Sequence, residues 1–349
     1  MVLVLAAPYV GVIRSEIRRA FPAQFSLIIN AAVGVALVAA VAAGLARVTA
    51  RRLPRYAAMA AAIVVAGAYS AATSSPDPAV RAVEHFHFVE YGVITFLFYR
   101  VWRDAGDWSA AALPFIAAFI VGAADEAFQW FLPARVGELK DVALNVVSIG
   151  CGLLFAVGAA PPPAFRFGWA ARSARLTRRA LAVCVLVLAA FVHLVHLGVV
   201  IPDPAAGAFT SRFTADELAA LGRERLVAWQ REPPLVRPAR MSREDQYMTE
   251  GLQHVQARNR AWEAGEAFTA WRENLILERY FAPVLDTPSY VAPQGHRWNP
   301  THRADAEGRA RGTETRPFTS AAYPYPILAW PPWLLWLGAV ALAAGLAFV

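Results

Sequence analysis

The chain has 349 residues, of which 57% are hydrophobic and 17% are charged. Soluble globular domains hold about 45–50% apolar and about 25% charged residues, so this composition favours a membrane protein and excludes a disordered or collagen-like chain. The net charge is +7, but residues 201–325 hold 16 arginines against 16 aspartates and glutamates. The excess positive charge therefore lies beside the apolar segments, where basic residues set membrane topology, and no nucleic-acid partner is predicted.

Seven apolar segments could each cross a bilayer, which takes about 20 residues per helix. In chain order they are Phe25–Ala46, Arg55–Thr73, Glu84–Trp102, Trp108–Phe131, Asp141–Ala160, Ala180–Ile201 and Pro326–Val349. The predicted fold is therefore all-α, a polytopic transmembrane helical bundle of about seven spans. Residues 25–200 form its main transmembrane region, and residues 326–349 form a C-terminal transmembrane helix.

Arginines in the short loops predict the orientation of these spans. The loops after the first, third and fifth spans carry eleven arginines, whereas the alternate loops carry three basic residues. Loops rich in lysine and arginine stay in the cytoplasm. Residues 201–325 are therefore predicted to be extracytoplasmic and the C-terminus cytoplasmic. Residues 1–24 are a separate N-terminal segment, in which Pro8–Phe21 is predicted to be an interfacial amphipathic helix.

Residues 201–325 are predicted to form an extracytoplasmic α-helical domain. Thr214 and Glu217 have the spacing of a capping box, which opens a helix that continues to about Arg231. Three further helices are predicted, one from Ser242, one over about residues 268–280 and a short one near Thr301–Arg311. The aromatic residues at helical spacing in these segments are predicted to form the core of the domain.

Polar side chains lie together at one depth of the predicted bundle. Placing a polar side chain inside a bilayer costs free energy, so such a group indicates a structural or functional role. They stand at the start of the third span, the end of the fourth, the connection that follows and the start of the fifth. They are Glu84, His87, Glu90 and Tyr91; Asp125, Glu126 and Gln129; Arg135; and Asp141 and Asn145. Residues three or four apart share a helix face, so three polar faces are expected to converge near the outer boundary of the membrane.

Four short motifs in this region resemble the VanZ-like family. They are His87-Phe88-Val89-Glu90-Tyr91, Asp125-Glu126-Ala127-Phe128-Gln129, Pro133-Ala134-Arg135 and Asp141-Val142-Ala143-Leu144-Asn145. The resemblance covers about Arg55–Ala160 and implies an integral membrane protein of the bacterial envelope. Some members of the family are linked to resistance to a lipoglycopeptide antibiotic, but the resemblance implies no particular reaction. Glu84 departs from the family pattern, in which a lysine is expected.

Glu126 is the predicted acid or base of this cluster, because a carboxyl group at the edge of the hydrocarbon suits proton transfer. His87 is its predicted partner. The predicted ligand-binding residues are Asp125, Gln129, Arg135, Asp141, Asn145, Tyr91 and Glu84. An alternative is that the same polar residues form a structural network that locks the helices together. Whether the chain is an enzyme is left open.

Arg135 could hold a phosphate or carboxylate with its planar guanidinium group, or it could pair with Glu138 or Asp141 within the loop. A metal site made by His87 and nearby carboxylates is a weaker alternative, because the spacing matches no known zinc motif. No metal and no cofactor are therefore predicted.

The predicted function is to bind or process a polar lipid headgroup, a lipid-linked cell-wall intermediate or an amphiphilic antibiotic at the outer face of the membrane. Two alternatives stay open. The same ionisable residues could line the pathway of a transporter or flippase component. The chain could instead be a non-catalytic scaffold that recruits an envelope protein through residues 201–325. The lipid bilayer is the partner common to all three.

Overall fold

The computed structural model describes residues 13–14, 16–73, 75, 77–131, 137–231, 246–288, 292–313, 315–323 and 326–348. Its described elements are mostly helices, as the all-α prediction requires, with one pair of short strands in addition. The chain divides into two compact units. The membrane unit comprises Met1–Phe128, Glu138–Phe191 and Trp336–Val349, and the polar unit comprises Gln129–Gly137 and Val192–Leu335.

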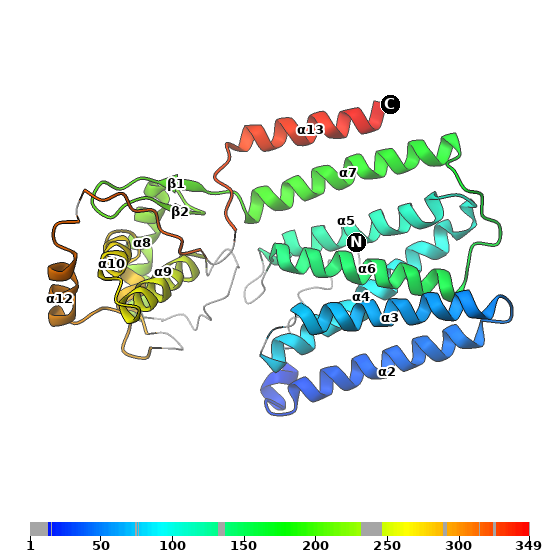
Figure 1. Cartoon of the computed structure of the whole chain (residues 1–349), viewed down its shortest axis with the longest axis horizontal. Helices are drawn as coiled ribbons and strands as arrows, with labels where there is room; N and C mark the ends of the chain where they lie inside the picture. The colour runs from blue at the N-terminus through cyan, green and yellow to red at the C-terminus, as the bar shows by residue number, and fades with distance from the viewer. Residues whose placement is uncertain are drawn as a thin grey trace. The chain divides into compact units, whose positions relative to one another are not determined.

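The long apolar helices belong to the membrane unit (Figure 1). They are α2 (Phe25–Ala46), α3 (Arg52–Thr73), α4 (Pro78–Trp102) with the 3₁₀ turn η1 (Arg103–Ala105), α5 (Ser109–Gln129), α6 (Leu139–Ala159), α7 (Ala171–Val195) and α13 (Pro332–Phe348). Within the described residues, five helices are long and apolar enough to cross a membrane, namely α2, α3, α5, α6 and α7. α4 has 25 residues but includes four charged side chains, and α13 has 17 residues. The structure supports a multi-pass membrane protein, and the number of seven spans stays a prediction.

Small residues let the central helices of the membrane unit approach closely. α6 packs along both α3 and α4, and α4 also packs against α2. Where α6 meets α4, a Cβ atom on Gly152 would lie 2.7 Å from the Cα atom of Gly92. Where α6 meets α3, the guanidinium of Arg55 donates to the carbonyl oxygens of Gly158 at 2.8 Å and Ala159 at 2.5 Å. These contacts fix α6 against both neighbours and so position the polar residues at its opposite end.

The sixth predicted span differs from the observed helix. α7 extends from Ala171 to Val195, whereas the predicted span began at Ala180. Its first turns are rich in arginine, so hydropathy does not detect them although they are helical. The last residues of the predicted span, Val199–Ile201, form strand β1, which pairs antiparallel with β2 (Phe209–Ser211). Consecutive β-branched residues favour a strand, and an apolar strand cannot be told from a helix end by hydropathy alone.

The polar unit adds five helices to these strands within its described residues. They are α8 (Ala215–Arg231), α9 (Gln246–Glu263), α10 (Ala267–Tyr280), α11 (Ala282–Asp286) and α12 (Pro300–Ala310). The capping box of α8 is confirmed, since Thr214 N donates to Glu217 Oε2 at 2.8 Å and Glu217 N donates to Thr214 Oγ1 at 3.3 Å. The helix start predicted at Ser242 lies outside the described residues, as does much of the helix predicted over Pro8–Phe21.

A buried polar group ties together three segments of the polar unit. His254 on α9 and Glu273 on α10 are each 1% exposed, and His254 Nδ1 lies 2.7 Å from Glu273 Oε2. Ser320 Oγ donates to the other carboxylate oxygen, Glu273 Oε1, at 2.5 Å. Because this hydroxyl bonds to the carboxylate and lies on the Nδ1 side of the ring, the group does not have the geometry of a catalytic triad. Its role is to stabilise the core.

Asp203, which follows β1, is expected to make the polar unit sensitive to acid. Its carboxylate accepts hydrogen bonds from Ala205 N and Ala206 N, both at 2.8 Å, and from Tyr280 at 2.9 Å, and it pairs with Arg279. Burial raises the pKa of Asp203, but these hydrogen bonds to the ionised form outweigh burial, so its pKa lies below the usual range.

A folded pKa below the unfolded value gives a stabilisation that is complete above the unfolded pKa of about 4 and is lost as the pH falls through the folded pKa. Asp203→Asn should therefore lower the free energy of unfolding at neutral pH by about 2 kcal/mol. It should also weaken the loss of stability on acidification. Urea unfolding of both proteins between neutral and acidic pH, followed by tryptophan fluorescence, measures both effects, and an identical acid dependence in the two proteins would contradict this assignment.

Candidate functional site

The first polar face belongs to α4. The helix begins at Pro78, and the side chain of Asp77 caps it by accepting a hydrogen bond from Ala79 N at 2.8 Å. His87 and Tyr91 are one turn apart on this helix. Their rings stack, with centroids 5.9 Å apart and planes inclined by 7°. Tyr91 is fully buried and His87 is half-buried, so this face turns into the bundle.

The second face belongs to α6 and meets the first through a direct hydrogen bond. His87 Nδ1 donates to Asn145 Oδ1 at 3.0 Å. Asn145 and Ser148 are fully buried, whereas Asp141, one turn before Asn145, is half-buried. On α6, the polar side chains therefore extend from Asp141, which is partly accessible, to Asn145 and Ser148 in the interior of the bundle.

The third face belongs to α5, and a glycine allows it to come close. A Cβ atom on Gly122 would lie 3.0 Å from the ring of Tyr91 and 3.3 Å from Asn145 Nδ2. Glu126, one turn beyond Gly122, is fully buried, and Asp125 is half-buried. Three helices thus surround one polar cluster, which we define as His87, Glu90, Tyr91, Asp125, Glu126, Asp141, Asn145 and Ser148.

The polar cluster is rich in negative charge. The carboxylates of Asp125, Glu126, Glu90 and Asp141 all act electrostatically on the hydroxyl group of Tyr91. Interactions between charges strengthen where water is excluded. The cluster therefore favours protons, cations and hydrogen-bond donors over anions.

Two donors inside the cluster have no acceptor within the described part of the chain. They are the amide nitrogen Nδ2 of Asn145 and the hydroxyl group of Ser148, both buried. A buried polar group without a hydrogen bond costs about 1–3 kcal/mol, so folded proteins rarely keep one without a functional or structural reason. The interior of the cluster consequently offers donors from α6 beside carboxylates from α4 and α5.

Lys140 and Glu138 join the site although the sequence analysis gave them no binding role. Lys140 Nζ donates to Glu84 Oε1 at 2.6 Å, and Ser75 N donates to Glu84 Oε2 at 2.9 Å. This ion pair joins α6 to α4. Lys140 is the single lysine of the sequence, which was the signal available for finding it.

Glu138, which immediately precedes α6, is the other addition. Burial, the carboxylate of Asp141 and more weakly that of Glu84 raise the pKa of Glu138, and Lys140 lowers it; together they bring this pKa to about 7. A carboxyl group with this pKa exchanges its proton near neutral pH.

Two predicted site residues remain to be placed. Gln129 is buried as the last residue of α5, in the segment that belongs to the polar unit. Arg135 and the motif that contains it lie outside the described residues. Among the residues described here, no three histidine, cysteine, aspartate or glutamate side chains come together as a metal site. The roles assigned to the individual residues stay predictions.

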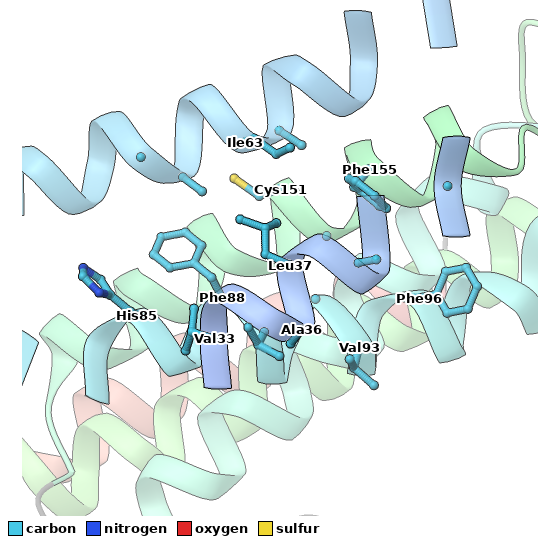
Figure 2. A pocket seen from close by; sticks show the side chains of 18 of the residues that line it. Val33, Ala36, Leu37, Ile63, His85, Phe88, Val93, Phe96, Cys151 and Phe155 are labelled. Atoms are coloured by element: carbon cyan, nitrogen blue, oxygen red, sulfur yellow. The ribbon is translucent and has the colours of Figure 1, made fainter. Parts of the chain in front are cut away.

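The large cavity of the membrane unit lies on a different face of α4 (Figure 2). It has a volume of about 500 Å³ and is bordered by α2, α3, α4 and α6. His85 stands at one end, and Phe96 and Phe155 stand at the other. No sequence motif predicts this cavity, because it arises from the spacing of helices that lie apart in the chain.

Comparison with known proteins identifies the region that holds the polar cluster. Residues 25–160 match the family model described as VanZ/LLP1. Neither the curated proteins nor the solved structures include a match to the chain. The matched residues begin with α2, which the four motifs did not cover, and end directly after α6. The resemblance seen in the sequence is confirmed, and residues 25–160 form the VanZ-like region of a multi-pass membrane protein.

Proposed function

We propose that the polar cluster binds the headgroup of a polar lipid, a lipid-linked cell-wall intermediate or an amphiphilic antibiotic at the outer face of the bacterial inner membrane. The observation that carries this proposal is the meeting of buried donors, Asn145 Nδ2 and Ser148 Oγ, with the carboxylates of the cluster. A ligand that both accepts and donates hydrogen bonds would satisfy the two sets together.

The chemistry of the cluster narrows the class of headgroup. A bare phosphate would accept from Asn145 and Ser148 but would be repelled by Glu126 and its neighbours. Hydroxyl and amide groups, as on a sugar or a peptide, accept and donate at once. We therefore expect a headgroup rich in hydroxyl or amide groups to bind here, with any phosphate it carries held outside the cluster by Arg135.

Within this proposal Glu126 and His87 act on a proton. Glu126 lies in the buried floor of the cluster, and His87 is oriented by its hydrogen bond to Asn145. Such a pair could neutralise a bound amine or activate a bound hydroxyl group. The cluster would first bind the headgroup, and proton transfer by Glu126 and His87 would follow on the bound ligand.

Native mass spectrometry of the full-length protein in mild detergent, after incubation with a bacterial envelope lipid extract, tests the proposal. Wild type should retain one specific polar lipid. Glu126→Gln and Arg135→Ala should each reduce its retention at least about tenfold, because each removes a charge-assisted hydrogen bond. Asp104→Asn is the matched control, since it removes an exposed carboxylate in η1, beyond the opposite end of α4.

Two results would contradict the proposal. In the first, wild type carries only bulk phospholipid, which would make the cluster a structural network between helices. In the second, the folded Glu126→Gln and Arg135→Ala proteins retain the same lipid as the control. Circular dichroism of each variant establishes that it is folded.

The transporter alternative receives less support from the packing. Deeper along the same helices, the residues that follow the cluster are Ile94, Ala118 and Ile149, with Phe98 and Phe115 against them. Such an apolar core offers no continuation for a polar substrate. A binding site open to one side of the membrane fits these residues better than a pathway through it.

A further inference from the structure

A second site in the membrane unit is the apolar groove between α2 and α3 (Figure 2). α2 packs on α4, and α3 packs on α6, so that α4 and α6 form the floor of the groove. Its volume of about 500 Å³ falls within the range of small-molecule sites, about 300–1,000 Å³. Phe88, Val89 and Gly92 line it from α4, which is a different face from the one that bears the polar cluster.

The groove is long. On α2 its lining runs from Val33 to Arg47, which corresponds to about 21 Å of helix. Small residues such as Ala36, Ala40 and Gly67 line it from both sides. A single extended hydrocarbon chain, which needs about 15 Å to cross half of the bilayer core, fits its length and its apolar lining.

The end of the groove near α4's first turns does not favour an anionic headgroup. His85 lies there, with its Nδ1 atom 3.0 Å from Asn30 Oδ1. Lys140 on α6 is paired with Glu84 at 2.6 Å, and Glu138 adds a further carboxyl group. Lys140 is therefore already engaged by a carboxylate.

The opposite end carries positive charge that is not balanced. Arg47 lines the groove there, and within the described residues its guanidinium donates to the carbonyl oxygen of Ala43 in α2, at 3.1 Å. Arg51 precedes α3 and Arg52 is its first residue; both side chains are exposed, and neither makes a hydrogen bond or ion pair with the described part of the chain. Arg55 is different, because it caps α6. Arg47 thus borders the groove at this end, and Arg51 and Arg52 follow it in the chain by four and five residues.

We propose that this groove binds one acyl chain of an anionic phospholipid, with the lipid phosphate held by Arg47, Arg51 and Arg52. Basic residues at the end of a cleft between membrane helices are suited to anionic headgroups, and guanidinium groups pair with phosphate through two hydrogen bonds. The site is separate from the polar cluster, so it does not depend on the function proposed for that cluster.

Native mass spectrometry with added phosphatidylglycerol or phosphatidylcholine of identical acyl chains tests this proposal on the full-length protein. Wild type should bind one phosphatidylglycerol in preference to phosphatidylcholine. Each basic residue near an anionic headgroup contributes about a fivefold change in binding, so Arg47→Gln/Arg51→Gln/Arg52→Gln should lose most of this preference, at least about tenfold. Gly67→Phe should lower the binding of both lipids, because the ring fills the groove.

Each variant has a matched control in the chain. Cβ atoms on Gly67 and Gly34 would both meet nothing within 4 Å, but only Gly67 lines the groove, so Gly34→Phe should bind as wild type does. Arg172→Gln/Arg178→Gln/Arg179→Gln removes the same charge from α7, outside the groove lining, and should keep the preference. Equal binding of the two lipids by wild type would overturn the proposal. So would Gly67→Phe binding as Gly34→Phe does, or the two arginine triples behaving alike.

Discussion

Gly152→Ala is expected to lower the free energy of unfolding of the membrane unit by about 3 kcal/mol, which is a large effect for one added methyl group. The new Cβ atom would lie 2.7 Å from Gly92 Cα and 3.3 Å from Gly92 O. These are backbone atoms, so α4 can make room only by moving as a whole. Unfolding by denaturant in detergent micelles measures the loss. Because the same two helices hold His87 and Asn145 together, the specific lipid predicted for the polar cluster should be lost as well.

Gly150→Ala is the matched control for this substitution. It adds the same methyl group to the same helix two residues earlier, where a Cβ atom would meet nothing within 4 Å. Alanine is a better helix former than glycine by about 1 kcal/mol, so this variant should be as stable as wild type or slightly more stable. If the two variants unfold at the same denaturant concentration, the contact between Gly92 and Gly152 does not hold α4 against α6.

Glu273→Leu is expected to destabilise the polar unit by about 3–5 kcal/mol, the loss that follows when one member of a buried polar pair is removed. The carboxylate of Glu273 serves both His254 and Ser320, and all three side chains are fully buried. Its loss leaves two polar groups in the core without their acceptor. Thermal unfolding and the protection of α9 and α10 amides from hydrogen exchange measure the effect.

Two further variants distinguish a lost interaction from a general intolerance of leucine. Glu263→Leu, at an exposed position near the end of α9, should change stability by no more than about 0.5 kcal/mol. His254→Leu/Glu273→Leu replaces both partners with apolar side chains and should recover part of the loss. A double variant that is less stable than Glu273→Leu would show that the pair does not act as a unit.

The sequence predicts helices well where one physical signal acts alone. The mainly apolar, charge-free run of α2 gives its bounds, Phe25–Ala46, directly. α4 begins at Pro78 rather than Glu84, because Asp77 and Pro78 start the helix before its apolar part begins. Hydropathy indicates which residues can lie in the lipid, whereas the hydrogen bonds at the helix ends determine where a helix starts and ends. The same difference explains why β1 was expected to be the end of α7.

For the candidate site, the sequence predicts which residues share a helix face but not which faces meet. Spacing places His87 with Tyr91 and Asp141 with Asn145, since each pair is one turn apart. Their approach depends on Gly122, whose lack of a side chain lets α5 come close, and that requires knowledge of the packing. The groove between α2 and α3 is still harder to predict, because it consists of space that side chains on separate helices leave unfilled.

The ion pair between Lys140 and Glu84 has a practical consequence for chemistry on the intact protein. Lys140 carries the only ε-amino group in the chain, and its side chain is 48% exposed. An amine-acylating reagent therefore has one side-chain target, and a lysine-specific endoprotease has one bond to cut. Since the protonated amine is not nucleophilic, acylation proceeds more slowly while Glu84 holds the proton in place. The rate of labelling of the purified protein thus reports, at a single side chain and without any engineered tag, how often the ion pair between Lys140 and Glu84 opens.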